Sequence, residues 1–177
     1  MNKLEFLLRW THVFAGIVWI GHLYFFNFVN IQLQGKMDDA TKKLVNPQLM
    51  PRALWWFRWG ANMLMKGDAG LTDRARWIMW GMLFGSIMWF NVWFIIWPAQ
   101  KKLLGGTAGD QAAALRARAT LASKTNTFLS APMLVGMLGA NHAGMSFSYG
   151  LLLLAALLGL AAIKGAYAHS TFVGQSV

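Results

Sequence analysis

The chain has no cysteine and few charged residues among its 177 positions. Without cysteine, the chain itself cannot form disulfides, thiolate zinc sites, iron–sulfur clusters or a covalently attached c-type haem. Charged side chains make up 12% of the sequence, about half of the share in an ordinary soluble domain. Hydrophobic residues make up 56%. A soluble globule of this size needs a more polar surface, so the composition favours a protein that is embedded in a lipid bilayer.

Acidic residues are especially scarce. Six Asp and Glu residues stand against sixteen Lys and Arg residues, which gives a formal net charge of +10. In a membrane protein such a basic excess lies in the loops and sets the orientation. No RNA-binding or zinc-finger motif accompanies it, so we expect no nucleic-acid partner. No Asp or Glu is expected to be buried within the long hydrophobic runs, where Glu5 stands only at the start of the first. This argues against a proton relay built from carboxylates.

Four hydrophobic runs are each long enough to cross a hydrocarbon layer of about 30 Å. The sequence therefore predicts an all-α integral membrane protein, a bundle of four transmembrane helices in a single domain over 1–177. The first run is too long for a cleaved signal peptide, so we expect it to remain as an anchor. The four predicted spans are about 5–29, 77–97, 127–144 and 149–167.

Two further helices are expected between these spans. The segment 51–66 is rich in tryptophan but short and interrupted by Arg58, which predicts a short interfacial or partly inserted helix. The segment 108–124 is rich in alanine and basic residues, which predicts an exposed helix. Within the second span, Gly81 and Gly85 form a GxxxG pair that allows a neighbouring helix to approach closely.

The charges leave two membrane layouts open. With four crossings, the basic stretches 30–76 and 98–126 fall on opposite sides, and Lys and Arg are evenly divided. If 51–66 also crosses, 30–52 and 98–126 share one side, and that side carries most of the Lys and Arg. The positive-inside rule favours five crossings, whereas the shortness of 51–66 favours four.

All four histidines lie in or at the ends of the hydrophobic runs: His12, His22, His142 and His169. Ionisable residues at membrane depth are costly and are functional candidates by default. Neutral imidazole is a natural axial ligand for haem iron. The structural alternative is a neutral imidazole that is bonded to a carbonyl or placed at the interface.

Depth and neighbouring volume rank these histidines. His12 and His22 differ by about 15 Å in depth on one helix. Five crossings bring His12 level with His142 and His22 level with His169, and four crossings exchange these partners. A porphyrin needs small neighbours, which favours His12 and His142, then His169, and last the crowded His22. One haem b is favoured over two, and Arg9 is placed to pair with a haem propionate. The small neighbours are Ala15 and Gly16 beside His12, Gly139 beside His142, and Gly165 and Ala166 beside His169.

Polar residues within the spans have two interpretations. Asn91 lies in the second span, and Asn126, Ser130 and Asn141 lie along the third. They form interhelical hydrogen bonds, worth roughly 0.6–2 kcal/mol each, or they line a polar pocket for a quinone or a small substrate.

Four stretches together resemble the membrane region of PuuD-type urate oxidases, in which a multi-helix membrane region precedes a cytochrome c domain. This chain has no CxxCH segment and is expected to lack that domain. The resemblance implies a membrane protein that binds haem b, with His12 on the family's first-helix histidine and His142 on the histidine that closes its SxPML helix. The first run also resembles, more distantly, the histidine-bearing first helix of the haem-dependent membrane protoporphyrinogen oxidase. The stretches are LLRWTHVFAGIVWIG at 7–21, WFRWGA at 56–61, IMWFNVWFIIWPAQKK at 87–102 and SKTNTFLSAPMLVGMLGANH at 123–142.

The sequence thus predicts a b-type haem protein of the bacterial inner membrane, with His12 and His142 as axial ligands of the iron. It would carry electrons between a quinone or small substrate and a partner cytochrome or oxidase. Two alternatives stay open. One is an accessory structural subunit of a larger membrane complex, and the other is a haem-dependent oxidoreductase acting on a urate-type or porphyrinogen-type molecule. No catalytic residue is singled out, and homo-oligomers are compatible with the sequence.

Overall fold

The computed structural model describes residues 3–62, 73–142 and 147–173, and within them it contains helices and no β-strand. The predicted all-α class is therefore confirmed. Two long helices each contain a π-helical turn, η1 and η2, that continues without a break into the next α-helix. The elements are α1 (Lys3–Tyr24), η1 (Phe25–Asn30), α2 (Ile31–Lys36), α3 (Asp39–Asn62), α4 (Asp73–Phe90), η2 (Asn91–Ile96), α5 (Trp97–Leu104), η3 (Gly109–Gln111), α6 (Ala112–His142) and α7 (Tyr149–Phe172).

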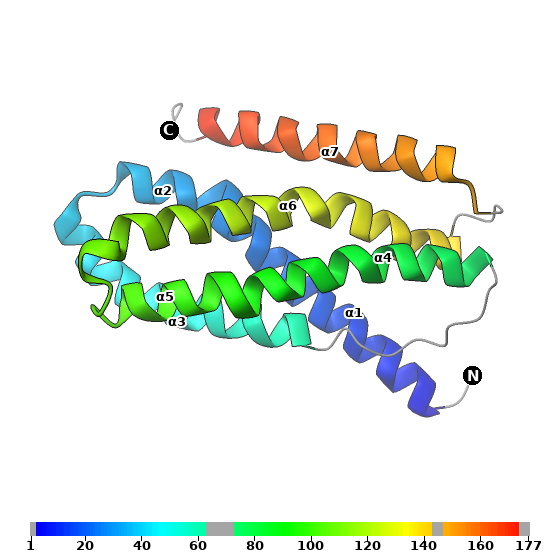
Figure 1. Cartoon of the computed structure of the whole chain (residues 1–177), viewed down its shortest axis with the longest axis horizontal. Helices are drawn as coiled ribbons and strands as arrows, with labels where there is room; N and C mark the ends of the chain where they lie inside the picture. The colour runs from blue at the N-terminus through cyan, green and yellow to red at the C-terminus, as the bar shows by residue number, and fades with distance from the viewer. Residues whose placement is uncertain (1–2, 63–72, 143–146, 174–177) are drawn as a thin grey trace.

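The long helices alternate in direction along the chain (Figure 1). α1, α4 and α7 run from one end of the bundle towards the other, and α3 and α6 run back. The connections from α2 to α3 and from α5 to α6 therefore lie at the same end as the C-terminus of α7. The basic stretches 30–52 and 98–126 share this end, which is the arrangement of the five-crossing layout.

Three helices are long and apolar enough to cross a membrane, judged by length and composition. They are Phe6–Lys36, Asp73–Leu104 and Tyr149–Phe172. The predicted spans 77–97 and 149–167 lie within the second and third of these, and 5–29 coincides with most of the first. These helices are compatible with an integral membrane protein.

The predicted fourth span, 127–144, is not among these three helices. Residues 127–142 of this span belong to α6, and residues 143–144 lie outside the described part of the chain. α6 also contains most of the segment 108–124 that was predicted as a separate exposed helix. α6 is thus one continuous helix where the sequence predicted two. Arginines and a lysine in its first half, and hydroxyl and amide side chains in its second, lower its hydropathy.

α3 is longer than the predicted helix over 51–66. It begins at Asp39, well before Pro51, which lies inside the helix and not in its first turn. Residues 63–66 lie outside the described part of the chain. The polar composition of the first half of α3 had indicated a loop, and contacts with other elements account for the difference.

Two contacts hold the start of α3, of which one is a local cap and the other joins α3 to α2. The carboxylate of Asp38 accepts a hydrogen bond of 2.7 Å from the backbone N–H of Thr41, which caps the helix. This hydrogen bond lowers the pKa of Asp38. The side chains of Gln34 and Asn46 exchange two hydrogen bonds, of 2.6 and 3.0 Å, and so join α2 to α3.

The closest approach of two helices is between α4 and α6. A Cβ atom built on Gly136 would lie 2.7 Å from Gly81 Cα and 2.9 Å from the Trp77 carbonyl oxygen. A Cβ atom on Gly81 would lie 3.2 Å from Met137 N. At Gly85 the contact is looser. The close approach predicted from the GxxxG pair is therefore confirmed, chiefly through Gly81.

Replacing Gly136 with alanine should lower the free energy of unfolding by about 1–3 kcal/mol, because the new methyl group would meet rigid backbone that no rotamer change can relieve. The matched control is Gly165→Ala in α7, where a Cβ atom meets nothing within 4 Å. That change should be neutral or slightly stabilising. Thermal unfolding of both purified variants in detergent measures the difference, and equal losses in the two would contradict the role of the contact.

Candidate cofactor site and the polar seam beside it

His12 lies on the inward face of α1. It is half-buried, and the buried residues Ala15, Trp19 and Leu23 continue the same face along the helix. This face packs against α3, where a Cβ atom on Gly60 would lie 3.0 Å from Trp19 Cβ and 3.1 Å from the Ala15 carbonyl oxygen. The imidazole therefore belongs to the side of α1 that faces the bundle.

His142 is the last residue of α6, and its side chain lies outside the described part of the structure. Because α1 and α6 run in opposite directions, the first half of α1 and the last turn of α6 lie towards the same end of the bundle (Figure 1). His12 and His142 thus belong to the same end of the molecule, as the five-crossing layout expects.

The small neighbours of the histidines do not all leave open space. A Cβ atom on Gly16 meets nothing within 4 Å, and the same holds for Gly165 beside His169. At Gly139, by contrast, a Cβ atom would lie 2.5 Å from Trp77 Cε3, because the indole packs on this glycine. The space expected beside His142 at Gly139 is therefore filled by a helix-packing contact.

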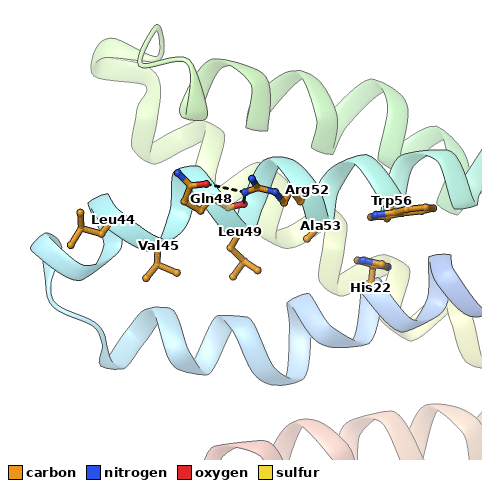
Figure 2. Close-up of a pocket in the computed structure, with 8 residues that line it drawn as sticks. All are labelled: His22, Leu44, Val45, Gln48, Leu49, Arg52, Ala53 and Trp56. Atoms are coloured by element: carbon orange, nitrogen blue, oxygen red, sulfur yellow. Dashed lines mark hydrogen bonds between the residues drawn. The ribbon is translucent and has the colours of Figure 1, made fainter.

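His22 and His169 are not brought together. His22 projects from α1 towards α3, and α7 lies on the other side of α1 in the same view (Figure 2). His169 is exposed in the last turn of α7. His22 Nδ1 donates a hydrogen bond of 2.7 Å to the Val18 carbonyl oxygen, one turn earlier. This contact fixes the ring in one orientation.

Two arginines are candidates for pairing with an anionic group, Arg9 of α1 and Arg58 of α3. Arg9 is exposed, one turn before His12. Arg58 of α3 is half-buried, with its guanidinium carbon 4.1 Å from the centre of the Trp97 ring and 5.4 Å from that of Trp93. These distances are typical of cation–π contacts. Its buried Nε has no hydrogen-bond acceptor among the described residues. From the sequence alone, Arg58 is treated only as an interruption of a hydrophobic segment. Its position among tryptophans in WWFRW is nevertheless a pattern that favours cation–π contacts.

A buried polar seam runs along α6, and Asn126 is its centre. Asn126 is fully buried, accepts a hydrogen bond of 2.8 Å from Asn91 Nδ2 of η2, and donates one of 3.0 Å to the Met88 carbonyl oxygen. Both hydrogen-bonding ends of the amide are therefore used between α6 and the α4–η2 helix.

The same seam joins α6 to α1, η1 and α7. Asn27 of η1 donates to Ser123 Oγ at 2.8 Å and accepts from the Tyr167 hydroxyl of α7 at 2.8 Å. Tyr24 and Ser130 share a hydrogen bond of 2.9 Å. Of the two interpretations of the intramembrane polar residues, interhelical hydrogen bonding is therefore observed for all but Asn141, whose side chain lies outside the described part.

Replacing Asn126 with leucine should lower the free energy of unfolding by about 1–3 kcal/mol, because the half-buried amide of Asn91 and the Met88 carbonyl oxygen would lose their partner. Thr125, which is exposed on the same helix, is the position for a matched control, Thr125→Leu. Unfolding in detergent measures both variants, and a stability of the Asn126 variant equal to that of the control would contradict a structural role for the seam.

The described residues contain no group of three or more His, Asp or Glu side chains that could together hold a metal ion. The fold and these sites define a class: an all-helical protein with helices fit to cross a membrane, in which imidazoles are the candidate ligands. A family model described as urate oxidase N-terminal matches residues 63–175. The chain belongs to this family, as the resemblance of its sequence predicted. No curated protein and no solved structure matches the chain significantly, so the likeness to protoporphyrinogen oxidase gains no support.

The matched region contains part of the site. It includes the stretches 87–102 and 123–142, with His142, and it also includes His169. α1 with His12 precedes it. Family membership therefore bears on α4 to α7, while the argument for α1 rests on its own residues.

Proposed function

We propose that the chain is a b-type haem protein of the bacterial inner membrane, which transfers electrons between a quinone or small substrate and a partner cytochrome or oxidase. The observation that carries the proposal is the shared end of the bundle for His12, on the inward face of α1, and His142, at the last residue of α6. Neutral imidazoles are common axial ligands of haem iron, and two histidines on different helices could hold it from both faces.

The described residues fit such a group on the α1 side. His12 is half-buried on an inward face, and the position of Gly16 one turn later is open. Trp19 Nε1, two turns beyond His12 on the same face, and Arg58 Nε are buried N–H donors with no acceptor among the described residues. Haem propionates are anionic acceptors that suit such donors. On the α6 side, the open volume is not at Gly139, which Trp77 covers.

The roles of the chain's residues follow from this arrangement. His12 and His142 would hold the iron, and Arg9 would pair with a propionate. The group supplies one-electron transfer when it is bound. The hydrogen-bonded seam along α6 and the glycine contact with α4 would keep the last turn of α6 at a constant position relative to the rest of the bundle.

Family membership favours one second candidate, a haem-dependent oxidoreductase that acts on a urate-like molecule. The reason is that the family model is described as the N-terminal region of urate oxidase. Turnover of urate by the purified full chain, with an added electron acceptor, distinguishes an enzyme from a carrier. A carrier should show reversible reduction of its haem without consuming urate.

Expression in haem-replete cells should give a purified protein with a Soret band and one haem per chain. His12→Ala and His142→Ala should each abolish most of the band, because each removes one axial ligand. His22→Ala should retain it, because His22 faces α3 and not the shared end of α1 and α6. A pyridine haemochrome assay with the haem-to-protein ratio measures all three. The proposal fails if the wild-type protein carries no haem, or if His12→Ala keeps the full ratio.

A further inference from the structure

An open groove of about 650 Å³ lies between α1 and α3 (Figure 2). His22 contributes from α1, and the other lining residues belong to α3. The volume is within the range of small-molecule sites, which is roughly 300–1,000 Å³. His12 is not among the described residues that line the groove. Its lining residues from α3 include Leu44, Leu49, Arg52, Ala53 and Trp56.

His22 presents a hydrogen-bond acceptor to this groove. A carbonyl oxygen can only accept, so the contact of 2.7 Å with Val18 places a proton on His22 Nδ1. In the neutral ring the other nitrogen, Nε2, is then an acceptor. Figure 2 shows the ring directed towards Trp56 and Ala53 of α3. The groove therefore contains an oriented acceptor that calls for a ligand with an O–H or N–H donor.

The α3 wall adds a cation and a flat aromatic surface. Arg52 Nη1 donates to the backbone carbonyl oxygen of Gln48 and, at 3.0 Å, to its side-chain oxygen, which holds the guanidinium along α3 at the edge of the groove. A guanidinium has five N–H donors, so other N–H groups of Arg52 remain available to a ligand. The indole of Trp56 is half-exposed and offers a stacking face. None of the lining residues is acidic.

The remaining wall is aliphatic and open to the outside of the bundle. Leu44 is largely exposed, and Leu49 and Val45 are half-buried. A ligand that fits must therefore combine a flat ring, at least one hydroxyl donor, an oxygen acceptor for the arginine and an apolar tail. A phosphatidylcholine headgroup would satisfy Arg52 through its phosphate but has no O–H or N–H donor for His22 Nε2.

We propose that this groove binds a quinol, a dihydroxylated aromatic ring on an isoprenoid tail, with His22 Nε2 accepting a ring hydroxyl, Arg52 donating to the second ring oxygen and Trp56 contacting the ring face. The proposal deepens the electron-transfer function, on which its physiological purpose rests, by naming the class of redox partner and its site.

The binding test uses the full chain in phosphatidylcholine nanodiscs, titrated with decyl-tailed ubiquinol and menaquinol. Ala53→Trp should weaken binding by at least about tenfold, because the indole would fill the groove. Ala53 is buried, so the thermal unfolding of this variant is measured as well. The surface control Ala162→Trp, at an exposed position of α7, should leave binding unchanged. His22→Phe should weaken binding by about 3- to 10-fold through the loss of one hydrogen bond, and His22→Gln, which keeps an acceptor, should recover part of that loss.

An azido-substituted quinone locates the site independently. After illumination, mass spectrometry should find the label on the peptide with His22 or on the 44–56 segment. Saturable labelling elsewhere, or equal binding by the wild type and Ala53→Trp, overturns the assignment. So does photoreactive phosphatidylcholine that labels the groove and is not displaced by the quinol. If His22→Phe does not fold, Ala53→Trp and His22→Gln still decide the matter.

Haem content separates this inference from the proposed function. Ala53→Trp and His22→Phe should keep the haem-to-protein ratio of the wild type while they lose quinol binding. A chain without haem that still binds quinol in an Ala53-dependent way would end the haem proposal and leave the groove assignment standing. A chain that binds haem but no quinol would overturn the groove assignment and leave the haem proposal standing.

Discussion

The backbone contact between Gly81 of α4 and Gly136 of α6 is the constraint on which the rest of the bundle depends. Lipid tails are as apolar as leucine, so helices in a bilayer associate through close packing and hydrogen bonds and not through a hydrophobic force. Two glycines let these helices approach until their backbones touch. α6 then contacts α1, α4, η2, α5 and α7, and so becomes the central helix. α3 is placed indirectly, through its packing on α1, η2 and α5.

The hydrogen-bonded seam along α6 uses the two π-helical turns. Asn27 lies in η1 and Asn91 lies in η2, and each amide bonds to a polar side chain of α6. A π turn adds a residue to the turn and so changes the direction in which the following side chains point. The buried amides of Asn27 and Asn126 are tolerated because the nitrogen and the oxygen of each are hydrogen-bonded. The seam therefore gives a structural role to most polar residues of the predicted spans. The histidines and Arg58 are the remaining candidates for binding a ligand.

His22 shows why neighbours in sequence are a poor measure of space around a ligand. Its bulky neighbours suggested a crowded ring, yet Val18 acts through its backbone carbonyl, which orients the imidazole, and Phe26 flanks the ring at 6.4 Å between centroids. The open space beside the His22 ring is the groove between α1 and α3. The first half of α3, which forms one wall of this groove, is polar in sequence and was not predicted as a helix. Conversely, the absence of a side chain at Gly139 predicted open space beside His142. The indole of Trp77, from α4, covers this glycine instead.

The sequence by itself determined the all-α class, three of the four predicted membrane-length helices, the close approach at Gly81 and the family, because these depend on composition, on hydrophobic length and on residues adjacent along one helix. It also named the histidines and the basic stretches. Only the tertiary structure decided that α3 begins at Asp39, that α6 is continuous, and that the basic stretches share one end. Those outcomes depend on contacts between distant segments, such as the pair formed by Gln34 and Asn46. No local pattern encodes such contacts.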